Sequence, residues 1–236
     1  MELELLTVNL WGLPWPVARD RVRRTKRLTA HLAERAYDLV GIQELWWPWR
    51  RRLDVASVQL PATRRDSGLA LAGGLASPHG VQVAHFRHHR GPDRLKRKGV
   101  LWAVAGTREG ARLRIGVTHL QAGRRHAHVR ARQVEEIVAR VEAERAPVVL
   151  MGDFNLYADS EVDQRSARSL HEAGLVDAAR ALAREEPTFG GGERFDRIYL
   201  RGGPEASLEP VEAEVLKESR VSDHHPVRVR VGLTVG

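Results

Sequence analysis

The segment from Val148 to Asn155 sets an acid and an amide directly after an apolar run. Its sequence is VVLMGDFN, in which Gly152 permits a sharp turn and Asp153 and Asn155 stand two residues apart. Alternate residues of an extended chain point to the same side, so this carboxylate and this amide can together hold a water molecule or a phosphoryl oxygen. A plain strand-to-turn exit accounts for the same letters, because Gly, Asp and Asn are common turn residues.

A second candidate is the segment VSDHHPV at 221–227. Its Asp223–His224 pair offers a metal ligand next to a group that acts as a general acid or base near neutral pH. A polar turn before the last apolar strand would look the same. The pair therefore indicates a functional site only if other polar residues lie next to it in the folded protein.

Asp196 opens another apolar strand, and a histidine base needs such a carboxylate to hold its second ring nitrogen. If Asp196 pairs with His224, it raises the pKa of the imidazole, and the base form is lost as the pH falls through that raised value. The residues are 28 positions apart (224 − 196), so only a folded site can join them. The alternative is a surface ion pair of Asp196 with Arg194 or Arg197.

Glu44 follows a short apolar run, LVGIQ at 39–43. Carboxylate oxygen is the ligand that Mg²⁺ prefers, usually with waters and substrate phosphate. The sequence contains no cysteine, so a metal has to be held by oxygen or imidazole. A solvated carboxylate at the rim of a sheet is the alternative for Glu44 alone.

Apolar periodicity predicts the elements that position these residues. Helices are expected at 19–35, 127–144 and 166–173, and strands at 3–10, 39–43, 68–72, 81–86, 101–105, 113–119, 148–151, 195–200, 211–216 and 227–231. Polar residues recur at or just after the ends of these strands, where open α/β folds collect their sites. They are Asn9, Glu44, His119, Asp153 and Asn155.

Composition sets the class of protein. The chain has 236 residues, of which 42% are hydrophobic, and a formal net charge of +8. Alternating strand-like and helix-like segments without a linker or repeat predict one α/β domain over residues 1–236. No apolar run is long enough to span a bilayer, and no secretory signal is evident, so a cytoplasmic location is expected. No feature indicates an obligate protein partner.

In this order, the motifs resemble the endonuclease/exonuclease/phosphatase superfamily, which includes deoxyribonucleases, abasic-site endonucleases, inositol polyphosphate phosphatases and neutral sphingomyelinases. The resemblance covers essentially the whole chain. It implies a four-layer α/β/β/α sandwich with two central mixed β-sheets. The matching segments are Thr7-Val8-Asn9, Gln43-Glu44, Ser67-Gly68, Thr118-His119, Gly152-Asp153-Phe154-Asn155, Arg194-Phe195-Asp196 and Ser222 to Val227.

The resemblance also implies a role for each matched polar residue. Three would contribute to a Mg²⁺ site, with Mn²⁺ as the alternative ion: Glu44 as principal ligand, then Asn9 and Asp223. Five would be catalytic: Asp153 and Asn155 as the pair that orients water, His224 as the catalytic histidine, Asp196 as its carboxylate partner, and His119 as a phosphate-contacting histidine. Asn9, Asn155 and His119 would also bind substrate.

The residue types within three motifs favour one branch of the superfamily, but they do not decide the substrate. The stretches NLWGLP at 9–14, ELW at 44–46 and THLQA at 118–122 look most like neutral sphingomyelinases. The segment 85–99, HFRHHRGPDRLKRKG, is densely basic instead of apolar, and predicts a docking surface for a polyanion or for anionic headgroups. The tryptophans in the segment 46–49 can stack on a base, touch a membrane interface or cap the core.

The sequence therefore predicts a Mg²⁺-dependent phosphoester hydrolase, acting on a phosphodiester by in-line attack of water. Its partner would be a nucleic acid or a phospholipid headgroup. The protein would then be a nuclease or a lipid phosphodiesterase, and a phosphomonoesterase ranks third. The alternative is a catalytically inactive or non-enzymatic module of the same fold that binds nucleic acid or phosphate through its basic charge.

Overall fold

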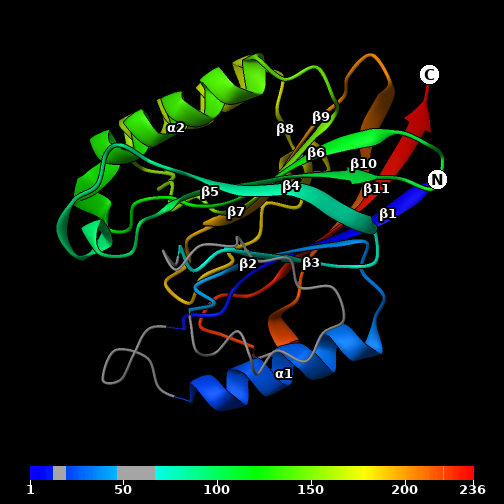
Figure 1. The fold of residues 1–236 in the computed structure, drawn as a ribbon. Helices are drawn as coiled ribbons and strands as arrows, with labels where there is room; N and C mark the ends of the chain where they lie inside the picture. Colours follow the sequence, from blue (N-terminus) through cyan, green and yellow to red (C-terminus); the bar gives the residue numbers. More distant parts are fainter. Residues whose placement is uncertain (13–19, 47–66, 220) are drawn as a thin grey trace.

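The computed structural model describes residues 1–12, 20–46, 67–219 and 221–236, and two β-sheets lie face to face in it (Figure 1). The first sheet contains, in order across it, β10 (Ala206–Val215), β11 (Val227–Val235), β1 (Glu2–Asn9), β2 (Leu39–Gln43) and β3 (Ala70–Ala72). Strands β1 and β2 run parallel, whereas the other neighbouring pairs run antiparallel. The sheet is therefore mixed.

The second sheet is also mixed. It contains, in order across it, β4 (Ala76–His85), β5 (Gly99–Gly106), β6 (Arg112–His119), β7 (Val148–Asp153), β9 (Asp196–Arg201) and β8 (Val176–Asp177). Strands β6 and β7 run parallel, and the other neighbouring pairs run antiparallel.

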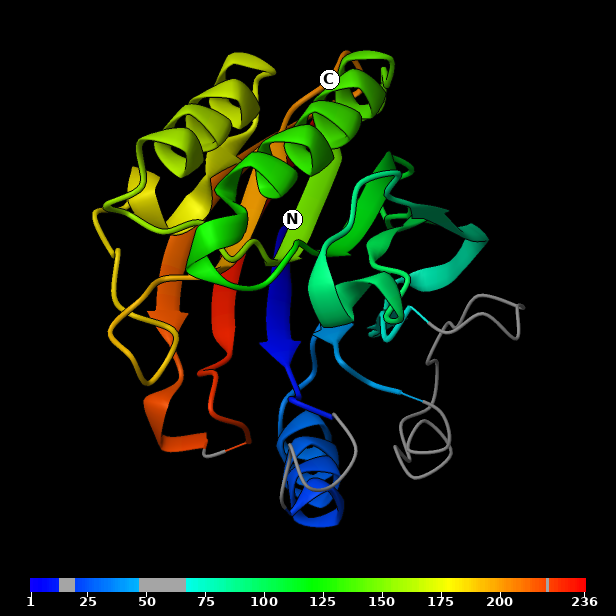
Figure 2. The same ribbon diagram turned by 90° about the vertical axis from the view of Figure 1, so that its left-hand side faces the viewer.

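Helices cover the outer faces of both sheets. Helix α1 (Arg21–Glu34) lies against the first sheet, and α2 (Ala127–Glu142) and α3 (Glu161–Glu172) lie side by side over the second (Figures 1 and 2). A short helix, α4 (Ala178–Ala181), follows β8. The described residues also form single turns of 3₁₀ helix at η2 (Gly91–Arg94), η3 (Arg124–His126) and η4 (Lys217–Ser219). The predicted four-layer α/β/β/α sandwich is thus confirmed.

Apolar side chains fill the space between these layers. Between the sheets, alternate residues such as Leu3 and Leu5 of β1 pack against residues of the second sheet such as Val149. On the outer face of the second sheet, α2 buries Val134 and Ile137, which lie three residues apart on one side of the helix. Each such side chain, fully buried, contributes roughly 1.5–3 kcal/mol to folding.

Strand direction brings the candidate residues to one edge of the sandwich. In the first sheet Asn9 pairs with Gln43, so the parallel strands β1 and β2 end together. In the second sheet His119 pairs with Asp153 at the ends of the parallel strands β6 and β7. Strand β9 runs antiparallel to β7 and begins where β7 ends, with Asp196 opposite Asp153. The predicted clustering at strand ends is confirmed.

Several element bounds differ from the sequence prediction. Helix α3 begins at Glu161 instead of 166, because the Ser160 hydroxyl accepts a hydrogen bond from the Asp163 backbone amide and caps a polar first turn. Strand β10 begins at 206 instead of 211, strand β4 covers 76–85 instead of 81–86, and β8 and α4 were not predicted. These stretches are short or strongly polar, and carry little apolar period. Position 19, the expected start of the first helix, lies outside the described residues.

Gly152→Ala is expected to destabilise the protein. Gly152 has φ 148°, and a Cβ there would overlap the carbonyl oxygen of Thr118. The free energy of unfolding, measured by urea denaturation, should fall by roughly 2–4 kcal/mol. Gly106→Ala is the matched control, because a Cβ there meets nothing within 4 Å. Equal losses in the two variants would contradict this account of the turn into Asp153.

Candidate active site

Asp153 is the residue on which the other polar side chains converge. Its side chain is buried at the end of β7, with a relative exposure of 2%. The Asn9 side-chain amide donates to Oδ2 at 2.9 Å, and the Asn155 backbone amide donates to Oδ1 at 3.0 Å. His119 Nε2 lies 3.3 Å from Oδ2. Burial raises the pKa of Asp153, which makes this carboxylate a better proton acceptor than one in water.

Asn9 and Asn155 are held in place by the backbone around them. Asn9 Oδ1 accepts a hydrogen bond from the Trp11 backbone amide at 2.9 Å, which leaves its amide nitrogen directed at Asp153. Asn155 has φ 50°, a left-handed conformation that asparagine tolerates better than most residues, and its Nδ2 donates to the Leu120 carbonyl at 3.3 Å. Both predicted amides therefore line the same site as Asp153.

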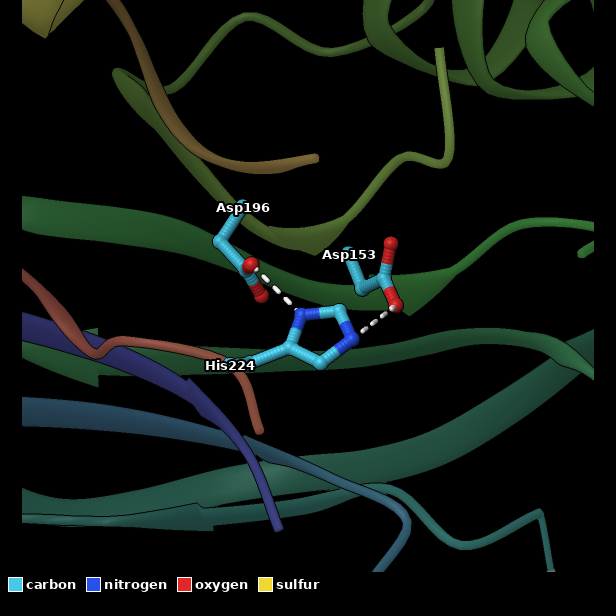
Figure 3. Close-up of side chains that lie close together, drawn as sticks. All are labelled: Asp153, Asp196 and His224. Carbon is cyan, nitrogen blue, oxygen red and sulfur yellow. Dashed lines mark hydrogen bonds and ion pairs between the residues drawn. The ribbon is translucent and has the colours of Figure 1, made fainter. Parts of the chain in front are cut away.

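Asp196 and His224 form a buried pair (Figure 3). His224 Nδ1 donates to Asp196 Oδ2 at 2.7 Å, and the Thr188 hydroxyl donates to the same oxygen at 2.8 Å. The alternative of a surface ion pair is wrong, because Asp196 is 1% exposed and the nearby guanidinium groups of Arg194 and Arg197 face Asp177 instead.

The charge state of His224 follows from this pairing. Burial alone would lower its pKa, but Asp196 and then Asp153 and Asp223 outweigh burial and raise the pKa to about 10. The predicted direction is confirmed, and the ring is an imidazolium at neutral pH. Its free Nε2 faces Asp153 Oδ2 at 4.0 Å, a separation that one water molecule or one phosphoryl oxygen can bridge (Figure 3).

Glu44 lies directly after β2, 6% exposed and with φ 56°. Its Oε1 is 3.9 Å from His119 Nδ1 and 3.9 Å from Lys96 Nζ, and its Oε2 is buried without a hydrogen-bond partner in the described residues. Burial raises the pKa of Glu44. A buried carboxylate oxygen that no protein donor satisfies is suited to a bound cation, and the solvated-rim alternative for Glu44 is wrong.

His119 completes the inner edge of the site between Glu44 and Asp153. Burial, reinforced by the charges of Lys98 and Lys96, holds the pKa of His119 well below its usual 6.5. The ring is therefore neutral and offers one N–H donor. This state suits contact with a phosphoryl oxygen, as predicted for His119.

Among the described residues, the structure shows one group of three possible metal ligands, and it differs from the predicted set. Ligand atoms of Asp153, Asp196 and His224 all lie within 4.8 Å of one another. The set predicted from the sequence was Glu44, Asn9 and Asp223. Asp223 is partly exposed, and its Oδ1 accepts from the neighbouring Ser222 hydroxyl at 2.9 Å. Its role as a ligand stays a prediction.

A buried Lys–Asp cluster beside the site was missed by the sequence reading. Lys98, 1% exposed, lies 2.9 Å from Asp93 Oδ2 and donates to the Leu120 carbonyl at 2.6 Å. Lys96 Nζ lies 3.2 Å from the other Asp93 oxygen. The prediction that the segment 85–99 is a docking surface is therefore wrong for Lys98, which faces inward. Arg94 and Arg97 remain exposed.

A second missed feature is a clamp between α2 and α3. Arg130 is fully buried, and its Nε and Nη2 donate to the two Asp163 carboxylate oxygens at 2.9 and 2.7 Å. Its Nη1 donates to the carbonyls of Gln121 at 3.1 Å and Gly123 at 2.8 Å, while Asp163 Oδ2 accepts from the Tyr157 amide at 3.2 Å. The pair thus fixes the loops that follow β6 and β7.

The tryptophan cluster is only partly described. The Trp46 ring lies over Gly68, where a Cβ would approach the ring carbons to 2.8 Å, so Trp46 helps to cap the first sheet. Residues 47–49 and 13–14, which include the other tryptophans of the cluster and part of the NLWGLP turn, lie outside the described residues.

Comparison with known proteins identifies the family. The model of the Endonuclease/Exonuclease/phosphatase family matches residues 6–224, a span that runs from β1 to His224. The chain belongs to the endonuclease/exonuclease/phosphatase family. The resemblance predicted from the sequence is confirmed.

Two curated relatives match this family member over nearly its whole length. A Drosophila melanogaster protein named "Putative neutral sphingomyelinase" is 26% identical over 99% of the chain, which spans 61% of the fly protein's length. A UPF0294 protein of Yersinia pseudotuberculosis is 26% identical over 96% of the chain and 83% of its own length.

Solved structures share the fold. Humanized D. rerio TDP2 has a TM-score of 0.80 at 19% identity, with 98% of this chain and 99% of that one covered. Sphingomyelinase C from Streptomyces griseocarneus has a TM-score of 0.71 at 18% identity, with 98% and 99% covered. At these identities the likeness shows the fold alone. None of the helices in the described part of this family member has the length and apolar character needed to cross a bilayer.

Asp93→Asn is expected to destabilise the protein in a pH-dependent way. Burial alone would raise the pKa of Asp93, but Lys98 and Lys96 outweigh it and lower the pKa below 3.8. The carboxylate therefore contributes stability above pH 3.8 that is lost as the pH falls through the lowered value. The variant leaves Lys98 buried without its counter-charge, so its free energy of unfolding at pH 7 should be lower by roughly 3 kcal/mol.

The loss should shrink as the pH falls below 3.8. Urea denaturation at a series of pH values measures it. The control is Asp159→Asn, which removes an exposed carboxylate paired with Arg124 and should leave stability unchanged. A loss in Asp93→Asn that is the same at every pH would contradict the predicted linkage.

Proposed function

We propose that this protein is a Mg²⁺-dependent phosphodiesterase that hydrolyses its substrate by in-line attack of water. One observation carries the proposal: the buried cluster of Asp153, Asp196 and His224, whose ligand atoms lie within 4.8 Å of one another. The amides of Asn9 and Asn155 lie at the same edge. Membership of a family of typically metal-dependent phosphoesterases supports it.

The residues fit a divalent cation. The unsatisfied Oε2 of Glu44 is the main support, since a hard cation takes carboxylate oxygen. Glu44 would hold the ion, together with Asn9 and Asp223. When bound, Mg²⁺ would neutralise charge developing on the phosphoryl oxygens and, by opposing the positive charge of the imidazolium, ease the loss of its proton.

Three neutral donors bind the phosphoryl group in this proposal. The Asn9 amide and the His119 ring nitrogen contact Asp153 Oδ2, and the Asn155 amide donates to the Leu120 carbonyl. All three are thus held at one edge, where they would share these contacts with the phosphoryl group. Each such donor is worth roughly 3 kcal/mol in the transition state. Their role is to bind and orient phosphate and to stabilise its added negative charge.

Asp153 and His224 handle the proton and the water. A water between His224 Nε2 and Asp153 Oδ2, which are 4.0 Å apart, is oriented by both groups. The raised pKa of Asp153 lets it accept a proton, whereas His224, whose pKa is about 10, begins as a donor toward a phosphoryl oxygen. For His224 to act as the base predicted from the sequence, it must first lose that proton.

The substrate class is either a nucleic acid or a phospholipid headgroup. A D. rerio TDP2 structure is described as a complex with a single strand DNA product, whereas the fly relative is named for sphingomyelin hydrolysis. A panel of single-stranded DNA, RNA, sphingomyelin, inositol phosphates and bis-p-nitrophenyl phosphate, each with Mg²⁺ or EDTA, tests the proposal. Hydrolysis of no phosphoester with Mg²⁺ or Mn²⁺ would overturn it. Cytoplasmic location and a single domain over 1–236 stay predictions.

Glu44→Gln should uncouple the protein from Mg²⁺. In EDTA the variant should be as stable as the wild type or more so, because it removes a buried charge whose Oε2 has no hydrogen-bond partner among the described residues. Added Mg²⁺ should stabilise the wild type, by about 2.7 kcal/mol at a hundredfold excess over Kd, and leave the variant unchanged. Thermal unfolding measures both. Diester hydrolysis should fall by about two orders of magnitude or more.

Glu205→Gln is the matched control for this change. Glu205 is an exposed residue in the chain just before β10, so its variant should keep the response to Mg²⁺ and the activity. An undiminished shift of the Glu44→Gln unfolding temperature by Mg²⁺ would remove Glu44 from the metal site.

Asp196 and His224 should act as one unit. Asp196→Asn keeps the shape but removes the charge, so kcat should fall more than substrate binding, and His224→Ala should cost at least as much. Each loss is expected to be about 10²–10⁴-fold. The double variant should be little worse than the worse single variant. Steady-state kinetics on a small diester with excess Mg²⁺ measures these losses.

His225→Ala provides the control for the histidine change, because His225 is the neighbouring imidazole and has no assigned role. It should retain near wild-type kcat. Strict additivity of the Asp196 and His224 losses in log kcat would mean that the two residues do not function as a dyad.

A further inference from the structure

A basic groove runs along the first turns of α2. Its cavity volume is about 530 Å³, and four arginines and four histidines line it. The only other lining residue is Val129, and no acidic side chain of the described residues lines the cavity. The arginines are Arg87 and Arg90 from the chain after β4, Arg125 from η3 and Arg132 from α2. These residues and the four histidines define what is called the basic groove below.

Most of this charge is uncompensated. Arg132 pairs with Glu135 at 2.9 Å in an exposed contact, which screens it only weakly. The guanidinium groups of Arg87, Arg90 and Arg125 have no acidic partner in the part of the chain that the structure describes. Three exposed arginines facing one cavity create a positive potential that attracts anions.

The basic groove is held against the chain that follows His119 at the end of β6. Gln121, two residues after His119, accepts a hydrogen bond from the Arg90 amide at 2.9 Å and donates to the Arg90 carbonyl at 3.1 Å. Gln133 of α2 donates to the His88 carbonyl at 2.8 Å. Figure 2 shows the start of α2 and the chain around η2 together at the edge where β1 ends. The groove is therefore tied through Gln121 to the chain that follows His119.

We propose that the basic groove binds the sugar–phosphate backbone of a single-stranded nucleic acid whose next phosphodiester occupies the catalytic site. The proposal rests on the proposed function and names its substrate class. From Arg125 to Arg132 the chain advances roughly 10 Å, a length over which more than one phosphate of an extended strand can be contacted. Arginine forks match phosphate oxygens, so the arginines carry the binding. His88 and His89 already direct a ring nitrogen at Glu136 and at the Phe86 carbonyl.

A membrane surface fits the groove less well. Interfacial binding needs apolar side chains that enter the acyl region, and among the described residues Val129 alone is an apolar residue that lines the groove. The adjoining cavity along α2, about 660 Å³, includes Glu135 and Glu136. These carboxylates repel phosphates, so the basic groove ends there and has a defined length for a polyanion.

The test compares two triple variants with the same loss of charge. Arg87→Gln/Arg90→Gln/Arg125→Gln removes the uncompensated charge of the groove. Arg108→Gln/Arg112→Gln/Arg184→Gln removes three exposed arginines elsewhere. Binding of a fluorescein-labelled oligothymidylate is measured by anisotropy in EDTA over a series of salt concentrations, so that catalysis does not enter.

The groove variant should bind about tenfold or more weakly than the wild type at low salt, and the slope of log K against log salt should fall by about 2, since each lost phosphate contact on a single strand accounts for about 0.7. The control variant should keep the wild-type slope. Equal slopes for the two variants would overturn the proposal. So would groove-dependent binding to phosphatidylserine vesicles without groove-dependent binding to the oligonucleotide.

Hydrolysis of bis-p-nitrophenyl phosphate by the wild type and the control variant separates this inference from the proposed function. If neither protein cleaves the diester but the groove variant alone loses oligonucleotide binding, the basic groove stands and the phosphodiesterase proposal fails. If the wild type and the control variant both cleave the diester, but the groove variant binds the oligonucleotide as well as the wild type does, the phosphodiesterase proposal stands and the basic groove proposal fails.

Discussion

The hydrogen bond from Asn9 to Asp153 joins the two sheets at the edge where the polar residues gather. Asn9 ends a strand of the first sheet and Asp153 ends a strand of the second, and each side chain is 2% exposed. A buried carboxylate is costly unless donors surround it, and those donors come from both sheets. The packing of the two apolar faces therefore determines whether the site residues meet. A shift of one sheet by a single residue would move Asn9 away, and the buried Asp153 carboxylate would lose this hydrogen-bond donor.

The same edge keeps features that a stability-optimised core would lack. Glu44 and Asn155 hold left-handed φ values of 56° and 50°, a conformation that costs such residues about 1–3 kcal/mol. Glu44 Oε2 and Asp196 Oδ1 are buried without a hydrogen-bond partner in the described residues. Backbone strain and unpaired buried oxygens that occur together at one place indicate a functional site. A ligand bound there would offset the folding free energy that these features cost.

Sequence predicted most of the site because strand direction is readable from apolar runs. A polar residue at the end of such a run lies at the sheet edge, which is how Glu44, His119 and Asp153 were found. Asp93 and Arg130 were missed, because charged side chains are expected on the surface and partners far along the chain cannot be read from spacing. For Arg130 a signal existed: it lies four residues before the buried Val134, in phase with the apolar side of its helix.

The basic segment 85–99 shows where composition stops being informative. Its charges take three different roles: Lys98 is buried against Asp93, Lys96 bridges Asp93 and Glu44, and Arg87 faces solvent in the basic groove. A single pairing produces this division. Asp93 draws the lysines inward, and the arginines that stay outside have no acidic partner among the residues that the structure describes. The buried Asp93 carboxylate thus decides which basic side chains of the segment turn inward, and the others supply the positive potential of the basic groove.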